Sequence, residues 1–427
     1  MGYLSIVSLA YHPLEKHVSI DSYHQRRSLP ILANVGIDLT IGQDMKSIEK
    51  YHQALKVLPH GVMSYASLSN LANTSTALYT PIDYGSGIQW ATGLTDEFPD
   101  AILQLGLWIV GMCKDIADGT MDAHIDALAT YLNQLNNDVL LRIGYEFDSP
   151  QNNYEPQEYI GAYRYIVNRL RAHGVTNTGY VWHASGFPPR RPWRLSDWFP
   201  GKDFVDWCGV SLFQQPYDCH VLKECKLPHA ERVVSMCKGM LGLPVMVAES
   251  TPFGGIIDEL DSDKGPNRAG YTGSSWSTWF IPVISFIEAH DIQMWSYINC
   301  HWDAQPQWRR ERAPGIHWGD SRVQCYPGIQ RRWIEQVLRN KRYSWKVNKT
   351  ATAQVVRGVK HTKKRDGSTL AQSLLCVTED IYMGIEPYQW HTLIFGVLIV
   401  LLFSCGVVWI FRREFQSSVT HDYVTIP

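Results

Sequence analysis

Two apolar runs of the sequence each end in a glutamate. Residues 138–146 read DVLLRIGYE and end at Glu146, while residues 243–249 read LPVMVAE and end at Glu249. A carboxylate is costly to bury among apolar side chains unless it has a partner, so two of them indicate a chemical role. A pair of carboxyl groups can transfer protons and attack an electrophilic carbon. The alternative is a pair of structural salt bridges at the rim of the fold.

Alternation along an extended strand gives each glutamate its neighbours. In the first run it places Arg142 on the same face as Glu146. In the second run it places Val245 and Val247 on the same face as Glu249. We therefore expect Arg142 and Glu146 to point into the same interior.

The chain around these glutamates alternates between strand and helix patterns. Eight short apolar runs predict strands at 35–41, 61–66, 101–108, 138–146, 178–184, 205–212, 243–249 and 292–298. Amphipathic stretches with helical periodicity are clearest at 121–135, 155–173 and 277–290. Strand–helix alternation of this kind predicts an α/β fold, a closed (β/α)8 TIM barrel whose working residues lie at the carboxyl ends of the strands. An open doubly wound sheet is the alternative, but no GxGxxG or P-loop motif follows an early strand.

The sequence divides into five parts. They are an N-terminal segment of unclear role (1–30), the barrel (31–340), a stem rich in Lys, Arg, Thr and Ser (341–391), an apolar segment (392–411) and a short tail (412–427). The apolar segment is free of charge, and it is long enough to cross a hydrocarbon core of about 30 Å as a transmembrane helix. Arg412 and Arg413 follow it. Their positive charge predicts a cytoplasmic tail and a barrel that is extracellular or lumenal.

The N-terminus does not fit this topology well. Residues 1–17 lack a basic region and a cleavage site, so they make a poor signal peptide. Two interpretations are open: a start further upstream, or a tail-anchored chain with its barrel in the cytosol. Sequons at Asn73 and Asn348 are compatible with a lumenal glycoprotein.

Cysteine usage favours an oxidising compartment. Nine cysteines are present, and Cys405 lies in the apolar segment. The others show no CxxC spacing of the zinc-binding kind. Candidate disulfide bonds join Cys219 with Cys225 across a short loop, or Cys300 with Cys325. A scatter of free thiols is the alternative.

Composition excludes some classes of function. The formal net charge is −2 and no basic stripe is present, so we expect no nucleic-acid partner. We also find no metal-binding or nucleotide-binding motif, and we expect neither a metal nor another cofactor. The chain is rich in Trp and Tyr, with 16 and 22 residues. These rings either fill a large core or line a cleft.

Five motifs in a fixed order resemble glycoside hydrolase clan A, and most closely family 26, which contains β-mannanases and related β-glucanases and β-xylanases. The resemblance covers roughly residues 35–310. The motifs are an arginine four residues before the first glutamate (Arg142, Glu146), a helix of the EYxxAYRxIVxxLR kind (158–171), a strand containing Val181 and Trp182, a VDW-G strand (205–209), and a P-[IV]-x-x-A-E strand ending at Glu249.

This resemblance implies retaining hydrolysis by double displacement. Glu146 would be the acid and then the base, and Glu249 would be the nucleophile. Trp295 matches the family's platform beneath the scissile sugar. The residues that we expect to bind substrate are Arg142, Tyr145, Trp182, His183, Tyr217 and Trp295.

Two positions depart from the family pattern. Tyr145 stands where clan members have asparagine, or histidine in family 26, directly before the acid/base. Phe213 occupies the slot of the tyrosine that holds the nucleophile, for which Tyr217 is a possible substitute.

The leading hypothesis is a membrane-anchored retaining glycoside hydrolase, endo-acting rather than exo-acting, that cleaves a β-mannan, β-glucan or β-xylan. The alternative is an inactive barrel that serves as a carbohydrate-binding or adhesion ectodomain.

Overall fold

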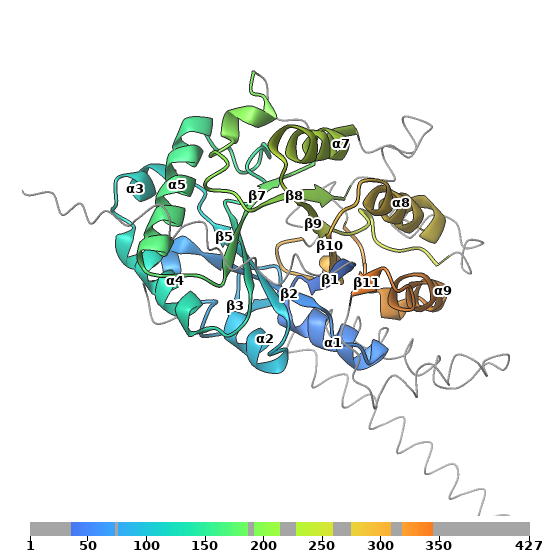
Figure 1. Cartoon of the computed structure of the whole chain (residues 1–427). Helices are drawn as coiled ribbons and strands as arrows, with labels where there is room; N and C mark the ends of the chain where they lie inside the picture. The colour runs from blue at the N-terminus through green and yellow to red at the C-terminus, as the bar shows by residue number, and fades with distance from the viewer. Residues whose placement is uncertain are drawn as a thin grey trace, which may run out of the picture.

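The computed structural model describes residues 36–72, 76–186, 192–213, 228–258, 275–308 and 318–344. The strands lie at the centre of the molecule and the helices surround them (Figure 1). The first four residues of the expected stem (341–344) are described, and the rest of the stem, the apolar segment and the tail lie outside the described residues. Among the helices that are described, none is both long enough and apolar enough to cross a membrane.

Eight parallel strands form a closed barrel. They are β1 (Ile37–Gly42), β2 (Gly61–Ser67), β5 (Ile102–Trp108), β6 (Val139–Ile143), β7 (Thr178–Ala184), β8 (Trp207–Leu212), β9 (Val245–Ser250) and β10 (Met294–Ile298). Each barrel strand pairs with the next one along the chain, and β10 pairs with β1 to close the ring. The closed barrel predicted from the sequence is confirmed, and each of the eight predicted strands overlaps one of these.

Helices connect successive strands and cover the outside of the barrel (Figure 1). The α-helices are α1 (Met45–Leu55), α2 (Ala91–Glu97), α3 (Cys113–Ala117), α4 (Asp122–Gln134), α5 (Pro156–Ala172), α7 (Pro228–Val234), α8 (Ile281–Ala289) and α9 (Pro327–Arg332). Turns of π-helix are η5 (Ser235–Leu241), η7 (Trp276–Phe280) and η10 (Trp333–Leu338). Turns of 3-10 helix are η3 (Leu68–Asn70), η4 (Leu195–Trp198), η8 (Trp302–Ala304) and η9 (Val323–Cys325).

Three short strands complete the described structure. β3 (Ile82–Asp83) and β4 (Ile88–Gln89) form an antiparallel hairpin between β2 and α2. β11 (Tyr343–Ser344) pairs with β1 beside the barrel.

The barrel interior changes from apolar to polar along the strands. A buried apolar layer is formed by Ile102, Leu140, Val181, Trp207, Met246, Ala248 and Met294. Because side chains two residues apart share a face of a strand, the next interior positions form a second layer. That layer contains the buried polar side chains Gln104, Arg142, His183 and Ser296. The polar layer is nearer the carboxyl ends of the strands, where a barrel carries its active site.

The pairing of β9 with β8 contains an irregularity. Val210 pairs with Val247, but the next residue, Ser211, pairs with Glu249. Ala248 is therefore an extra residue in β9, which defines a β-bulge.

This bulge reverses the alternation of side chains in β9. Val245 and Val247 pack in the large core between the barrel and the helices, whereas Glu249 contacts residues of the barrel interior. The prediction that Val245, Val247 and Glu249 share a face is wrong, because an extra residue turns the carboxylate inward.

The predicted strand at 138–146 is too long at its carboxyl end. β6 ends at Ile143, and Gly144 and Glu146 have positive φ angles of 56° and 52°. A left-handed backbone cannot continue a strand. Glu146 therefore lies in a tight turn that follows β6 and not on the face of Arg142.

One disulfide bond joins Cys208 of β8 to Cys237 of η5. Cys325 is also disulfide-bonded. The predicted pairing of Cys300 with Cys325 is wrong, because Cys300 is a buried free thiol. The predicted pair of Cys219 and Cys225 lies outside the described residues.

Candidate active site

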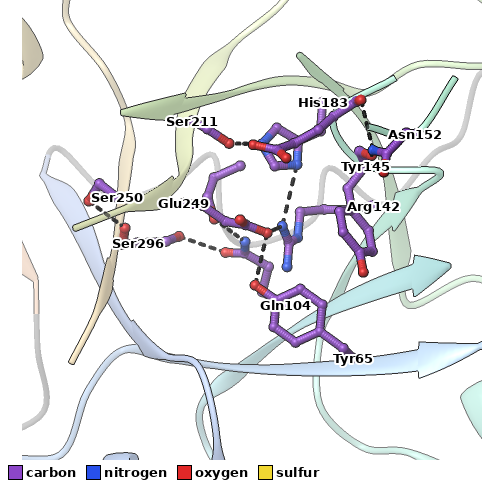
Figure 2. Close-up of polar contacts among 12 residues, drawn as sticks. Tyr65, Gln104, Arg142, Tyr145, Asn152, His183, Ser211, Glu249, Ser250 and Ser296 are labelled. Atoms are coloured by element: carbon purple, nitrogen blue, oxygen red, sulfur yellow. Dashed lines mark hydrogen bonds and ion pairs between the residues drawn. The ribbon is translucent and has the colours of Figure 1, made fainter. Parts of the chain in front are cut away.

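Glu249 lies at the carboxyl end of β9 and is almost completely buried, with 7% of its surface exposed. Its carboxylate forms an ion pair with the Arg142 guanidinium. It also accepts a hydrogen bond from the Tyr65 hydroxyl at 2.8 Å (Figure 2). Burial raises the pKa of Tyr65 well above its usual value, and the charge of Glu249 acts in the same direction. Tyr65 therefore keeps its proton and remains a donor to the carboxylate.

Two neighbouring aromatic rings contact Arg142. Its guanidinium carbon lies 4.9 Å from the centroid of the Tyr65 ring and 5.3 Å from that of the Tyr145 ring. Gly106 of β5 leaves room for this arrangement. A Cβ atom at that position would lie 2.6 Å from the Tyr65 ring and 3.1 Å from Nη2 of Arg142. The cation is thus fixed by cation–π contacts as well as by its carboxylate partner.

Glu146 is the second carboxyl group of the site, and its environment favours the protonated form. Burial raises its pKa to about 8, and the charges of Glu249 and Asp148 act in the same direction. A hydrogen bond from Ser211 and the charge of Arg142 act in the opposite direction. At neutral pH the site therefore pairs a protonated glutamic acid with an ion-paired glutamate.

The turn that carries Glu146 is held by Asn152. The side-chain amide of Asn152 donates hydrogen bonds to the carbonyl oxygens of Tyr145 and Glu146, each at 3.0 Å (Figure 2). A left-handed conformation costs a residue with a Cβ atom about 1–2 kcal/mol. Such strain persists only where surrounding contacts over-determine it, and Asn152 supplies those contacts.

A short chain of hydrogen bonds connects the two glutamates. Arg142 Nη1 lies 3.3 Å from Nδ1 of His183, and His183 Nε2 lies 3.0 Å from the Ser211 hydroxyl. Burial lowers the pKa of His183 well below its usual value, and the charge of Arg142 adds to this effect. The imidazole is therefore neutral. Because arginine can only donate, Nδ1 accepts and Nε2 donates to Ser211, which leaves the Ser211 proton for the Glu146 carboxyl group.

Five of the residues predicted for the site are brought together here: Arg142, Tyr145, Glu146, His183 and Glu249. Figure 2 labels four of them, Arg142, Tyr145, His183 and Glu249. Tyr217 lies outside the described residues.

The two tryptophans predicted to bind substrate are core residues. Trp182 has no exposed surface and stacks on Phe147, with ring centroids 4.5 Å apart. Trp295 is equally buried, and its indole nitrogen donates to the Ser250 hydroxyl at 2.8 Å. Neither ring can present a face to a sugar in this arrangement. The bulky indoles point away from the barrel interior and fill the layer between barrel and helices.

Several residues at the site were not predicted, among them Tyr65, Ser211 and Trp108. Tyr65 and Ser211 face the interior near the ends of β2 and β8, where alternation from Met63 and Trp207 would have located them. Trp108 ends β5, and it keeps 37% of its surface exposed while its ring lies 5.9 Å from that of Tyr145. Trp108 is thus an exposed ring beside Tyr145, the residue that precedes Glu146.

Phe213 is the departure that raised a question about the nucleophile. Its ring is largely buried and packs edge-on against Trp318, with centroids 5.3 Å apart. It has no hydroxyl to offer Glu249. Tyr65, from a strand on another side of the barrel, supplies that hydroxyl instead.

Two curated proteins align with most of the barrel. A β-1,3-xylanase from a Vibrio species is 32% identical over 313 residues, which cover 71% of this chain and 65% of that protein. A β-1,3-xylanase from an Alcaligenes species is 31% identical over 321 residues, which cover 73% of this chain and 66% of that protein. Over the aligned residues the chain is similar to these two glycoside hydrolases. The relationship predicted from the motifs is confirmed, although the alignments span slightly less than two thirds of each relative.

The other comparisons are less informative. No protein-family model matches the chain. A family 26 β-mannanase from Bacteroides ovatus has a TM-score of 0.49 and 13% identity, and the match covers 74% of this chain and 94% of that structure.

We find no metal-binding site among the described residues. Within them, no group of three or more His, Cys, Asp or Glu side chains is arranged to hold a metal ion.

Proposed function

We propose that this protein is a retaining glycoside hydrolase that cleaves β-glycosidic bonds in a polysaccharide. The supporting observation is a pair of buried carboxyl groups in different surroundings: burial raises the pKa of Glu146, and Glu249 is ion-paired with Arg142. The substrate class that we favour is β-1,3-linked xylan, because both curated relatives carry that activity in their names. β-Mannan and β-glucan are the next candidates.

Each group has a defined part in the proposed reaction. Glu146 gives its proton to the glycosidic oxygen, and the bond from that oxygen to the anomeric carbon breaks. Glu249 attacks the anomeric carbon and forms a covalent glycosyl-enzyme. Glu146, now ionised, takes a proton from water, and the resulting hydroxide displaces Glu249 and regenerates both groups.

The remaining residues position these two. Arg142 and Tyr65 orient the attacking oxygen of Glu249 through the ion pair and the hydrogen bond. The exposed face of Trp108 is suited to stacking on the apolar face of a sugar ring near the acid/base turn. An open aromatic face of this kind fits a chain-like substrate.

Substitution of the two glutamates tests the proposal. The full-length protein is assayed on β-1,3-xylan, β-1,4-xylan, β-mannan and β-glucan. Glu249→Ala should lower kcat by more than about a thousandfold, because no covalent intermediate can form. Glu146→Ala should lose much less rate on an aryl glycoside whose leaving group needs no proton, and added azide should restore part of that loss.

Control experiments distinguish a loss of catalysis from a loss of folding. Glu158→Ala changes an exposed glutamate on α5, and it should retain wild-type kinetics. Proton NMR at early times should show that the first product keeps the anomeric configuration of the substrate. An inverted product would refute the retaining mechanism, and a folded wild type that binds but does not cleave any of these glycans would favour the carbohydrate-binding alternative.

We also propose that the barrel lies on the outer or lumenal side of a membrane and is anchored by the apolar segment 392–411. The support from the sequence is the uncharged run followed by Arg412 and Arg413. The Cys208–Cys237 disulfide bond supports the same side, because disulfides persist in oxidising compartments.

A further inference from the structure

The bulge in β9 leaves a backbone group outside the regular ladder of hydrogen bonds. Ala248 is the extra residue between Val247 and Glu249, which pair with consecutive residues of β8. A carbonyl group that is buried without a partner is destabilising. A stable bulge at this depth therefore needs a donor from elsewhere in the fold.

Gln104 supplies that donor from the opposite wall of the barrel. Its side chain is completely buried, and its amide nitrogen donates to the Ala248 carbonyl oxygen at 2.6 Å (Figure 2). Gln104 belongs to β5, which stands four strands away from β9 in the eight-stranded ring. The hydrogen bond therefore spans the interior and fixes the peptide that immediately precedes Glu249.

Ser296 of β10 sets the orientation of the Gln104 amide. Its hydroxyl donates to the Gln104 side-chain oxygen at 2.7 Å. The two hydrogen bonds require the same orientation of the amide. The Ala248 carbonyl can only accept, so the Gln104 nitrogen must face it and the Gln104 oxygen must face Ser296. Three strands are thus tied together beneath the carboxylate.

Gly209 of β8 gives the bulge its space. A Cβ atom at this position would lie 2.9 Å from Cβ of Ala248 and 3.2 Å from the His183 ring. The absence of a side chain therefore allows the extra residue of β9 and the polar layer to occupy the same level of the barrel.

We propose that Gln104 is a positioning residue for the nucleophile: it clamps the bulge at Ala248, and the clamped bulge aims Glu249 at the anomeric carbon. This inference rests on the proposed function. The hydrogen bonds of the Gln104 side chain join it to Ala248 and Ser296, so it acts on Glu249 through the backbone of β9. Ser296 holds Gln104 in the donating orientation.

Gln104→Met tests the clamp, because methionine has a similar length but no donor. We expect kcat to fall about tenfold to a hundredfold, the loss typical of a misplacement of about 1 Å, while KM changes by less than about twofold. Ser296→Ala should show a smaller fall in kcat in the same direction, and it carries the test if Gln104→Met does not fold. Crystal structures of the variants should show the Glu249 carboxylate displaced from the Tyr65 hydroxyl.

The matched control is Ser64→Ala. Ser64 is a buried residue of β2 whose hydroxyl has no hydrogen-bond partner among the described residues, so its loss should leave kcat unchanged. A kcat within twofold of wild type for Gln104→Met, or an equal fall in Ser64→Ala, would overturn the proposal. If the wild type hydrolyses no glycan, the proposed function fails. The crystal structures still decide the clamp in that case: an unmoved Glu249 overturns it and a displaced one supports it.

Discussion

Two neighbours of Glu146 act on its pKa in opposite directions. The Ser211 hydroxyl stabilises the ionised carboxylate and lowers the pKa, whereas the negative charge of Asp148 raises it. Asp148 is itself buried, and burial raises its own pKa to about 6. Above that pH its charge helps to keep the proton on Glu146. The acid/base is therefore tuned by a donor on β8 and by a carboxylate two residues away in its own turn.

These neighbours predict opposite shifts of the pH profile. Glu146 must hold a proton for the first step, so kcat/KM is lost as pH rises through the pKa of Glu146 in the folded protein. Ser211→Ala raises that pKa and should move the basic limb to higher pH. Asp148→Asn lowers it and should move the limb to lower pH.

Asp148→Asn is a conservative change for this experiment. The Asp148 carboxylate accepts a hydrogen bond from the Ser185 backbone nitrogen at 2.7 Å, and an asparagine side-chain oxygen can accept the same bond. The measurement is kcat/KM against pH for the wild type and both variants. If the basic limb moves in the same direction in both variants, or moves in neither, the assignment of this limb to Glu146 is wrong.

The individual residues of the site could be predicted only in part. The apolar runs identified Glu146, Glu249 and Arg142, because a charged group among apolar neighbours stands out in a sequence. Tyr65 was missed because its position marks it only as facing inward. Its contact with Glu249 depends on how strands far apart in the chain meet across the barrel.

Among the elements, the turn after β6 does the most to place a functional group. Gly144 opens the turn with a φ of 56°, and a Cβ atom there would lie 2.8 Å from the Tyr159 ring of α5. The backbone must therefore be left-handed at a place where there is no room for a side chain. The position of Glu146 depends on both conditions.

Gly144→Ala should therefore impair both stability and activity. Left-handed backbone strain alone should cost about 1–2 kcal/mol of unfolding free energy, and the contact with Tyr159 adds to this. Displacement of Glu146 should lower kcat by about tenfold or more. Urea denaturation and steady-state kinetics measure the two effects.

Gly174→Ala is the matched control for this turn. Gly174 also has a positive φ, 74°, but a Cβ atom there would meet nothing within 4 Å. It should lose a similar amount of stability from strain while kcat stays at the wild-type value. Equal kcat in Gly144→Ala and Gly174→Ala would show that the turn does not position the acid/base.

Sequence patterns located the strands well but did not reveal where the strands depart from regular geometry. The strands were found because buried parallel strands are short apolar runs. The turn at Gly144 and the bulge at Ala248 were missed because alternation assumes a regular strand. Alanine carries no signal for a bulge, and the partner that stabilises this one, Gln104, comes from a distant strand.

On the scale of the whole molecule, the closed barrel was predictable from strand count and alternation, whereas the disulfide bonds were not. Cysteine spacing favoured neighbours such as Cys219 and Cys225, but Cys208 pairs with Cys237 across 29 positions of sequence. That pairing follows from the packing of α7, which continues into η5, against β8, and local spacing does not encode this packing. The placement of the chain relative to a membrane depends on segments beyond the barrel.

The proposed topology predicts that protease added to intact cells releases the barrel. An antibody against the barrel should detect a soluble fragment, because the cleavable stem would lie outside. Permeabilised cells provide the control, since the tail should become accessible only in them. Access to the tail but not the barrel in intact cells would contradict the proposed orientation. Non-reducing mass spectrometry of the released fragment should recover the Cys208–Cys237 peptide pair.

The bulge at Ala248 has an evolutionary consequence. Regular pairing resumes at once beyond it, since Leu212 stands opposite Ser250. A single-residue insertion or deletion at this point is therefore absorbed locally, and strands further along the chain keep their partners. Such a change alters only the backbone beneath the Glu249 carboxylate. A lineage can thus adjust the reach of its nucleophile by changing the length of one strand, while closure of the barrel stays intact.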